Sequence, residues 1–467
     1  MDPASPAVTT RLWHPFADMA AVSASGELVL ESGEGAYVVD EEGRRYLDAA
    51  AGLWYCNVGH GRREIAEAAA AQMTRLAAYS AFGDLATRPA LDLSERLSAM
   101  APMPDARVFL TSGGSDSVDT AVKLVRRYWT EVGRPERTAI VTRTHAYHGM
   151  HLAGTSLAGI AANRLGHGDL DAAVVQVDWD DSGSLEAVLD ERDDVAAFFC
   201  EPVIGAGGVY APPPGYLREV RELCRRHDVL FVADEVITGY GRVGIMFGSE
   251  RWNLRPDVVL TAKGITSGYV PLGAVLVSGR VAEPFWVDRG SPVMWRHGYT
   301  YSAHATACAA ALANLDIVER EGLVERVASL QHVLGRALAP LSAYDAVSEV
   351  RAGVGLLGAV EFTPDAVGTG MPARVIAGLR ERGVLTRTLA SGAIQVSPSF
   401  VVSEADIAVI AAALEESLRS AGAVRASAAR VDPAAPLGGS LLGNPSPGER
   451  AVAFDDRYYA DQRPPHH

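Results

Sequence analysis

The chain has 467 residues, of which 48% are hydrophobic and 21% are charged. A chain of this length and composition can bury a large core and form a two-domain subunit. Its 42 Lys and Arg residues against 57 Asp and Glu residues give a formal net charge of −15, without long runs of one sign. This excludes the basic surface expected of a protein that binds nucleic acid or an anionic membrane.

Cysteine usage and the N-terminus indicate the compartment. The four cysteines show no paired spacing: Cys56, Cys200, Cys224 and Cys308. Residues 1–16 contain no basic region followed by an apolar one, and no segment is long and apolar enough for a membrane span. We therefore expect a reduced, cytoplasmic protein.

The first functional motif in chain order lies at residues 108–116, where an apolar run is followed by Ser112-Gly113-Gly114-Ser115. The apolar positions after it recur at helical spacing: Val118, Ala121, Val122 and Val125. This pattern predicts a strand, a glycine turn and the start of a helix. The free N–H groups of the first helical turn, with the Ser115 hydroxyl, would hold a phosphate dianion.

A second motif follows the predicted strand 139–142 and contains Tyr147, whose ring could stack on a flat cofactor. The histidines His145, His148 and His151 have a three-residue spacing that resembles metal ligands. No acidic residue lies among them, and no Cys/His pattern elsewhere completes a site. We expect no metal here.

Two further strands end in residues that suggest chemistry. Asp234 ends the apolar run 229–233, and Lys263 follows the apolar run 258–260. The separation, 263 − 234 = 29 residues, matches one strand, crossover and strand, so both side chains could reach one edge of a parallel sheet. Desolvation would lower the pKa of the lysine, so that its neutral amine could condense with an aldehyde.

These groups together favour pyridoxal phosphate (PLP) as the cofactor. Its aldehyde needs a lysine, its ring nitrogen needs an ionised carboxylate such as Asp234, and its phosphate needs an anion site. The segment with Gly114 and Ser115 supplies the anion site. Taken separately, Lys263 could be a lysine that extends to solvent from a strand end.

The periodicity predicts an α/β fold with a mostly parallel sheet in a large domain. From about residue 105 to 278, short apolar runs alternate with helical stretches. We expect the large domain to span 55–310, and a smaller α+β domain to be built from residues 1–54 and 311–420. That domain should contain strands at 354–362 and 394–396 and a last helix at 404–420. The proline-rich tail 421–467 is expected to be disordered.

At this point the chain resembles the class III PLP-dependent aminotransferases of fold type I, in particular their omega-transaminase branch. The likeness is carried by the segments Leu12–Phe16, Gly35–Asp40, Asn57–His60, Ser112–Ser115, Tyr147–Gly149, Asp234–Val236, Ala262–Gly264 and Ser397–Pro398. It implies that Lys263 forms the Schiff base, that Asp234 contacts the pyridine nitrogen, and that Tyr147 and Val236 pack on the two ring faces. Gly114 and Ser115 match the phosphate pair.

The resemblance also implies a shared active site. Thr300 matches a threonine that reaches the phosphate of the neighbouring subunit, so a homodimer, and possibly a tetramer, is expected. Two departures from the family pattern occur: Asp116 stands where glutamate is usual, and Ser302-Ala303-His304-Ala305 replaces Ser-Gly-His-Pro. Neither removes a group that the chemistry requires.

Substrate class depends on a few further positions. Ala206 stands where related branches carry a glutamate that neutralises an active-site arginine, and Arg387 matches a mobile arginine that binds carboxylates. Trp54, Phe82 and Tyr147 match residues that line the substrate pockets. From the residues alone, Trp54 and Phe82 could equally be core, and Arg387 could be a solvated arginine at a strand edge.

The resulting prediction is a ping-pong transaminase that moves an amino group from an amine or omega-amino acid to an oxo acid such as pyruvate. An aminomutase of the glutamate-1-semialdehyde type would use the same lysine and aspartate. A dinucleotide-dependent oxidoreductase is a second alternative, given the many glycines. Its fingerprint fails, however, because Gly205-Ala206-Gly207-Gly208 precedes Pro212-Pro213-Pro214 instead of opening a helix.

Overall fold

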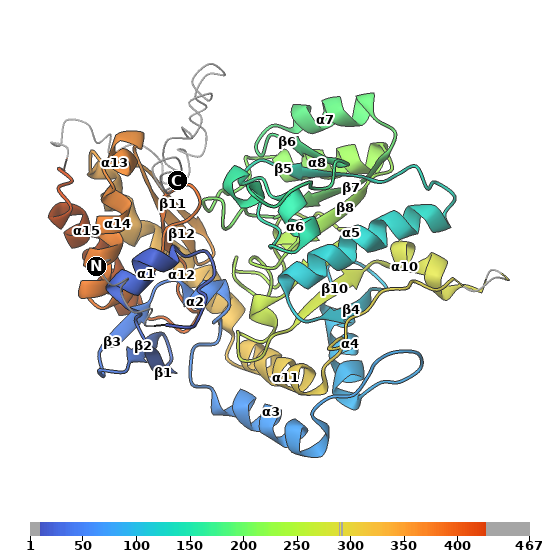
Figure 1. Ribbon diagram of the computed structural model, residues 1–467, viewed down its shortest axis with the longest axis horizontal. Helices are drawn as coiled ribbons and strands as arrows, with labels where there is room; N and C mark the ends of the chain where they lie inside the picture. The colour runs from blue at the N-terminus through green and yellow to red at the C-terminus, as the bar shows by residue number, and fades with distance from the viewer. Residues whose placement is uncertain (1–9, 289, 291–292, 426–467) are drawn as a thin grey trace, which may run out of the picture.

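The computed structural model describes residues 10–288, 290 and 293–425, arranged as two lobes (Figure 1). The right-hand lobe contains the middle of the chain, and the left-hand lobe combines N-terminal elements with C-terminal ones. Of the tail 421–467 for which we predicted disorder, residues 421–425 are instead ordered, with Arg425 bridged to Tyr344, and residues 426–467 lie outside the described residues.

The large lobe is built on a seven-stranded sheet. In spatial order its strands are β4 (Arg107–Thr111), β10 (Gly273–Val277), β9 (Val258–Thr261), β8 (Leu230–Asp234), β7 (Val195–Cys200), β5 (Ala139–Arg143) and β6 (Val174–Val177). The five strands from β9 to β6 pair in parallel, and β10 is antiparallel to both of its neighbours. The predicted mostly parallel α/β sheet is confirmed.

Helices cover both faces of this sheet, because alternate strand residues point to opposite sides. On one face Val232 and Leu260 pack with the apolar side of α5, whose buried residues include the predicted stripe of Val118, Ala121, Val122 and Val125. On the other face Phe231 and Val259 pack with α4, α8 and α11. The helices of this lobe are α3 (Arg63–Leu76), α4 (Arg88–Met100), α5 (Gly114–Glu131), α6 (Leu152–Leu157), α7 (Ser182–Glu191), α8 (Tyr216–Arg226), α9 (Gly248–Arg251), α10 (Gly279–Trp286) and α11 (Ala305–Arg320).

The small lobe contains two sheets. One has the order β1 (Leu30–Glu34), β2 (Tyr37–Asp40), β3 (Arg45–Asp48) and β13 (Val384–Leu385), and the other β11 (Val347–Val354), β12 (Leu357–Phe362) and β14 (Ile394–Val396). The pairing of β13 with β3 joins the two ends of the chain in one sheet. The helices here are α1 (Met19–Ser25), α2 (Ala51–Trp54), α12 (Leu323–Leu338), α13 (Pro364–Gly368), α14 (Met371–Glu381) and α15 (Glu404–Ser420).

The prediction of one strand over 354–362 is wrong. Val354 ends β11, Leu357 begins β12, and the two strands form an antiparallel hairpin. The turn uses Gly355 at φ 57°, where an added Cβ would lie 2.1 Å from the Arg242 carbonyl oxygen. A glycine is needed there both for the left-handed backbone and for the close approach. The strand at 394–396 and the helix at 404–420 are confirmed.

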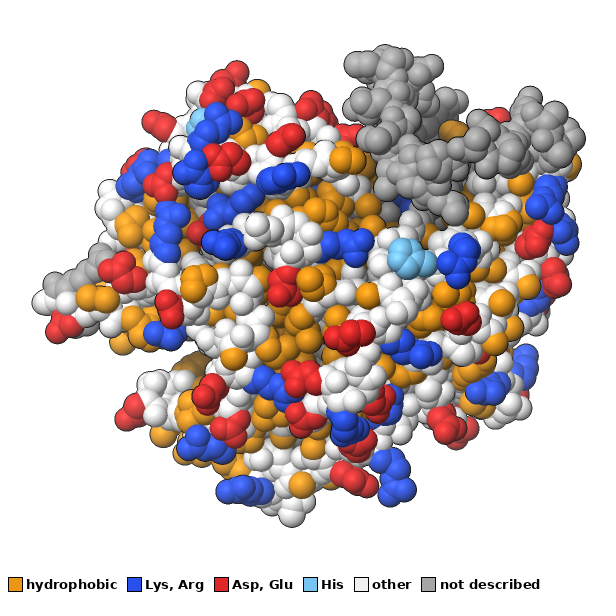
Figure 2. All heavy atoms as spheres, turned by 180° about the vertical axis from the view of Figure 1, so that it is seen from behind, with side chains coloured by type: hydrophobic (Ala, Val, Ile, Leu, Met, Phe, Trp, Pro, Cys, Tyr) orange, Lys and Arg blue, Asp and Glu red, His pale blue; other side chains and the backbone are white. Residues whose placement is uncertain are grey.

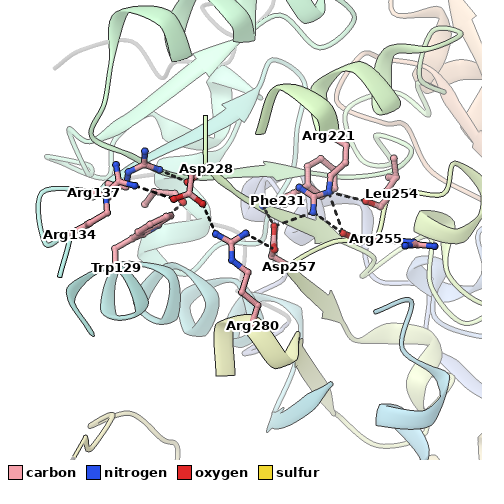
Figure 3. A network of polar contacts seen from close by, with 11 residues as sticks. Trp129, Arg134, Arg137, Arg221, Asp228, Phe231, Leu254, Arg255, Asp257 and Arg280 are labelled. Carbon is pink, nitrogen blue, oxygen red and sulfur yellow. Dashed lines mark hydrogen bonds and ion pairs between the residues drawn. The ribbon is translucent and has the colours of Figure 1, made fainter. Parts of the chain in front are cut away.

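Ion pairs hold the N-terminal ends of the central strands (Figure 3). Asp228 accepts from Arg280 at 2.5 Å and from Arg134 at 3.1 Å, just before β8. Asp257, just before β9, accepts the Phe231 N–H at 2.9 Å and lies 3.7 Å from Arg280. Both aspartates are therefore partnered at this edge.

The surface carries charges of both signs. In Figure 2, basic and acidic side chains are interspersed over the face shown, with apolar side chains between them. Among the described residues, no helix is long and apolar enough to cross a membrane.

Candidate active site

Lys263 lies directly after β9, at the C-terminal edge of the central sheet, as the sequence predicted. Burial lowers the pKa of its amine to about 8, although the charges of Asp234 and Glu201 act in the opposite direction. The Nζ atom lies 5.7 Å from the centroid of the Trp54 ring. It makes no hydrogen bond to a described residue. The buried amine therefore loses its proton more readily than a solvated lysine does.

Asp234 ends β8 and is buried beside Lys263's strand. One carboxylate oxygen, Oδ2, lies 2.7 Å from His148 Nδ1, and Oδ1 accepts the Val236 N–H at 3.1 Å. These contacts fix the carboxylate in one orientation. His148 Nε2 is buried and has no partner among the described residues.

His148 is paired with Asp234 in the structure, a contact that we did not predict from the sequence, where the three histidines were considered only as metal ligands. Within the described ranges, no group of three His, Cys, Asp or Glu side chains is placed to hold a metal ion. The signal available in the sequence was the position of His148 next to Tyr147, at the end of a strand in the same sheet.

Glu235, the second carboxylate in this motif, has a structural role. It accepts the N–H groups of Gly248 at 2.9 Å and Ser249 at 2.6 Å and is also bound by the Thr238 hydroxyl. Burial raises the pKa of its carboxyl group. It therefore stabilises the loop after β8 and does not face Lys263's amine as a reactive group.

The segment that we predicted to hold a phosphate forms the first turn of α5. The helix begins at Gly114, and its first-turn N–H groups have no acceptor within the helix. Ser115 Oγ accepts the Met150 N–H at 3.2 Å, which leaves its own proton to donate. A Cβ on Gly114 would lie 3.1 Å from Val236 Cγ1. The glycine therefore lets the helix N-terminus approach the residue predicted to pack on the ring.

Tyr147 is positioned through its backbone. Its N–H donates to Glu201 Oε1 at 3.0 Å, and Glu201 Oε2 accepts the Gly205 N–H at 3.0 Å. Burial raises the pKa of both the tyrosine hydroxyl and the Glu201 carboxyl. The charge of Glu201 also raises the pKa of Lys263. Glu201 is therefore a further residue of this site, and it was not predicted from the sequence.

Arg387 stacks on Trp54, with its guanidinium carbon 4.6 Å from the ring centroid. Its Nε donates to Gln395 Oε1 at 2.9 Å, and burial lowers the pKa of the guanidinium. Arg387 is half-buried, so the arginine is not fully solvated as the alternative expected. Trp54 is 2% exposed and packs in a cluster with Val203 and Ile237, so it is both a core residue and a wall beside Lys263.

Phe82 and Thr300 lie at the surface of this subunit. Phe82 is 58% exposed, and a Cβ on Gly298 would lie 3.1 Å from its ring. Thr300, two residues further on, is exposed as well. The predicted roles of these two residues stay predictions.

The residues present fit PLP by their chemistry. The helix N-terminus at Gly114 and the free Ser115 proton suit its phosphate, the anchored Asp234 suits its ring nitrogen, and Tyr147 and Val236 suit its two faces. The unbonded Lys263 amine suits its aldehyde.

Comparison with known proteins decides the family. The model of the class III aminotransferases matches residues 19–418. The chain belongs to this family. Among solved structures, a PLP-bound amine transaminase from an uncultivated Pseudomonas species superposes with a TM-score of 0.83 at 39% identity, covering 88% of this chain and 99% of that one.

Two curated relatives of this aminotransferase are similar over most of its length. The putrescine–pyruvate aminotransferase of Pseudomonas aeruginosa is 37% identical over 369 residues, which cover 74% of this chain and 80% of the relative. The gamma aminobutyrate transaminase 3 of Solanum lycopersicum is 37% identical over 409 residues, covering 81% and 78% respectively.

The protein is therefore a PLP-dependent aminotransferase of fold type I. The dinucleotide-dependent oxidoreductase is ruled out by this family membership, and the glycines at 205–208 form a loop that ends in the bridge between Ile204 and Tyr210. When bound, PLP supplies a carbonyl carbon for the amino group and a protonated ring that withdraws electrons. In the roles that the sequence predicts, Lys263 Nζ would take the proton from the substrate Cα and pass it to the cofactor, and Asp234 would contact the ring nitrogen.

Proposed function

We propose that this aminotransferase moves the amino group of an amine or omega-amino acid to an oxo acid such as pyruvate, in a two-stage ping-pong reaction. The observation that carries the proposal is the state of Arg387. Among the described residues no carboxylate pairs with it, and its side chain is bonded only to the neutral Gln395. Its positive charge is available for the carboxylate of a substrate.

The environment of Ala206 supports this assignment. The Ala206 carbonyl oxygen accepts the Ala390 N–H at 3.1 Å, so residue 206 lies against the hairpin that bears Arg387. A glutamate at this position would add a negative charge beside that hairpin, and alanine adds none. The putrescine–pyruvate aminotransferase and the amine transaminase among its similar proteins agree with a pyruvate-using amine transaminase.

Replacement of Arg387 by alanine tests the proposal. The variant should show a raised KM for pyruvate, at a cost of about 2–5 kcal/mol, typical of unpairing a charge-assisted contact. A simple aromatic or aliphatic amine should react in the first half-reaction nearly as fast as before. Thr388→Ala, at the exposed neighbouring residue, is the matched control and should change neither.

Half-reaction kinetics separate the outcomes. Equal weakening of amine and oxo acid would make Arg387 structural and remove the basis for this substrate class. The same assay tests the aminomutase alternative, which predicts full turnover of a single substrate without any acceptor.

We further propose a homodimer with shared active sites. Apolar side chains that are exposed on this subunit surround Phe82 and Thr300 in the sequence: Tyr79, Leu85, Met294 and Tyr301. The two segments contact each other at Phe82 and Gly298. Exposed apolar side chains concentrated in this way are suited to packing against a second subunit.

Mixing two inactive variants tests this arrangement. Lys263→Ala lacks the amine, and Thr300→Glu should repel the phosphate of the neighbouring subunit. Mixed dimers would contain one site with both native residues, so activity should return after the two variants are unfolded and refolded together. No recovery, despite a dimer mass in light scattering, would show that Thr300 does not act across the interface.

The cysteines support a reducing, cytoplasmic setting, which we include in the proposal. All four are buried and free in the structure. Titration of the protein as isolated from cells, in denaturant without reductant, should find four thiols.

A further inference from the structure

Gln395 lies directly opposite Arg387 on the same hairpin. The chain runs from β13 through Arg387, turns at Gly392, and returns into β14, where the Gln395 N–H donates to the Arg387 carbonyl oxygen at 3.0 Å. The Thr386 hydroxyl donates to the Gln395 carbonyl oxygen at 2.6 Å. These backbone contacts set residues 387 and 395 side by side.

The side chain of Gln395 is fully buried, and both ends of its amide are used. Oε1 accepts from Arg387 Nε at 2.9 Å, and Nε2 points to the Ala50 carbonyl oxygen at 3.4 Å. Because a carbonyl can only accept and a guanidinium can only donate, the two contacts allow one amide orientation. Gln395 thus connects Arg387 with the segment that leads to Trp54.

These contacts constrain the guanidinium on two sides. Its face lies over the Trp54 ring, and its Nε is engaged by Gln395. The Nη1 and Nη2 atoms make no hydrogen bond to a described residue. This pair of nitrogens forms a fork that matches the two oxygens of a carboxylate.

We propose that Gln395 is a positioning residue that holds Arg387 with its Nη edge directed at the substrate carboxylate. It thereby contributes to the choice between oxo acids and amines that lack a carboxylate. The inference rests on the proposed function of Arg387 and adds a residue that does not itself touch the substrate.

Gln395→Leu removes the acceptor with little change in volume. The KM for pyruvate should rise about tenfold, the loss typical of one hydrogen bond to a charged group, while kcat at saturating pyruvate and the amine half-reaction stay near wild type. Gln395→Glu keeps an acceptor but adds a charge that pairs with Arg387. Its KM for pyruvate should rise further than in the leucine variant, again without loss of the amine half-reaction.

A buried glutamine elsewhere in the small lobe provides the matched control. Gln331 Oε1 accepts the Gly355 N–H at 3.1 Å, at the turn of the β11–β12 hairpin. Gln331→Leu should lower stability and leave the KM for pyruvate unchanged. If Gln395→Leu does not fold, Gln395→Met, which keeps the length of the side chain, gives the same measurement.

A double-mutant cycle decides whether Gln395 acts through Arg387. In the Arg387→Ala background, Gln395→Leu should cause no further increase in the KM for pyruvate. An additive increase, or a parallel loss in the amine half-reaction, would overturn the inference. If Arg387→Ala raises the KM and Gln395→Leu does not, the positioning role alone is wrong. If Arg387→Ala itself has no effect on pyruvate, the proposed function fails and this inference fails with it.

Discussion

The two ends of strands β8 and β9 place similar side chains in different settings. At the N-terminal ends, Asp228 and Asp257 have arginine partners within ion-pair distance. At the C-terminal ends, Asp234 faces a histidine, and the Lys263 amine has no hydrogen-bond partner among the described residues. The strands between these ends are equally buried. The Lys263 amine therefore differs from the three aspartates at these edges, because each aspartate has a charged or polar side-chain partner and the amine has none among the described residues.

Backbone strain does not distinguish the two ends. Lys263 adopts φ 47° at the C-terminal edge, but Asp228 adopts φ 52° and Arg255 φ 44° at the other edge. Left-handed residues of this kind cost about 1–2 kcal/mol wherever they occur. The contrast between the ends thus lies in the polar contacts of their side chains.

The largest effect is expected for Lys263→Ala. It removes both the amine that condenses with the cofactor and the group that moves the proton, so turnover should fall by several orders of magnitude. Folding should persist, because no described residue depends on a hydrogen bond from this amine. Steady-state turnover and circular dichroism measure the two effects. Near-wild-type turnover would show that another residue performs the chemistry.

Asp234→Asn should have the next largest effect. The amide keeps the shape of the side chain but carries no negative charge, so it cannot stabilise the protonated ring nitrogen of the cofactor. The chemical step should therefore slow about a hundredfold. Single-turnover absorbance of the donor half-reaction measures this step. An unchanged rate would mean that the buried carboxylate only anchors His148.

The lysine pKa predicts a smaller, graded effect of pH. The unfolded lysine keeps its proton to about pH 10.5, whereas burial lowers its pKa in the folded apoenzyme to about 8. The rate of PLP capture by apoenzyme should therefore rise about tenfold per pH unit below this value and level off above it. A rate independent of pH in this range would contradict the burial of the amine.

The same shift predicts a trend in stability. Since the unfolded state binds the extra proton between about pH 8 and pH 10.5, the contribution of Lys263 to the free energy of unfolding rises across this window. The difference in denaturation midpoint between wild type and Lys263→Met apoenzyme, followed against pH, isolates this contribution.

The smallest effect on turnover is expected at the opposite edge. Asp257→Ala leaves the Phe231 N–H without its acceptor and removes a buried charge near Arg280. The free energy of unfolding should fall by about 2–4 kcal/mol, while kcat and KM stay near wild type. Denaturant titration and steady-state kinetics measure both. A large loss of kcat in the folded variant would show that the two ends are coupled.

Much of the cofactor half of this site follows from the sequence. Parallel strands bring their C-terminal ends to one edge, so two residues at strand ends, Asp234 and Lys263, could be placed together. The glycine turn before α5 could also be predicted, because an apolar run precedes it and a helical apolar pattern follows it. Strand direction, however, is not encoded in an apolar run. The antiparallel course of β10 therefore could not be predicted from Gly273–Val277.

Contacts between distant segments could not be predicted either. The ring of Trp54 lies under Arg387, and the side chain of Gln395 reaches Ala50. The amino-acid pattern of each segment does not specify these contacts, because they depend on how β13 pairs with β3. His148 was visible in the sequence, but its partner Asp234 lies two strands away in the sheet, beyond β7.

That pairing of β13 with β3 has a consequence for the order in which the chain can assemble on the ribosome. Every strand of the large sheet has been synthesised once residue 277 is made, so the lysine, the aspartate and the anion site can come together early. Val384 must appear before it can pair with Leu47, and only then can Arg387 meet Trp54. Such contacts between remote segments form slowly and late. In a growing chain, Lys263 and Asp234 can therefore come together before Arg387 contacts Trp54.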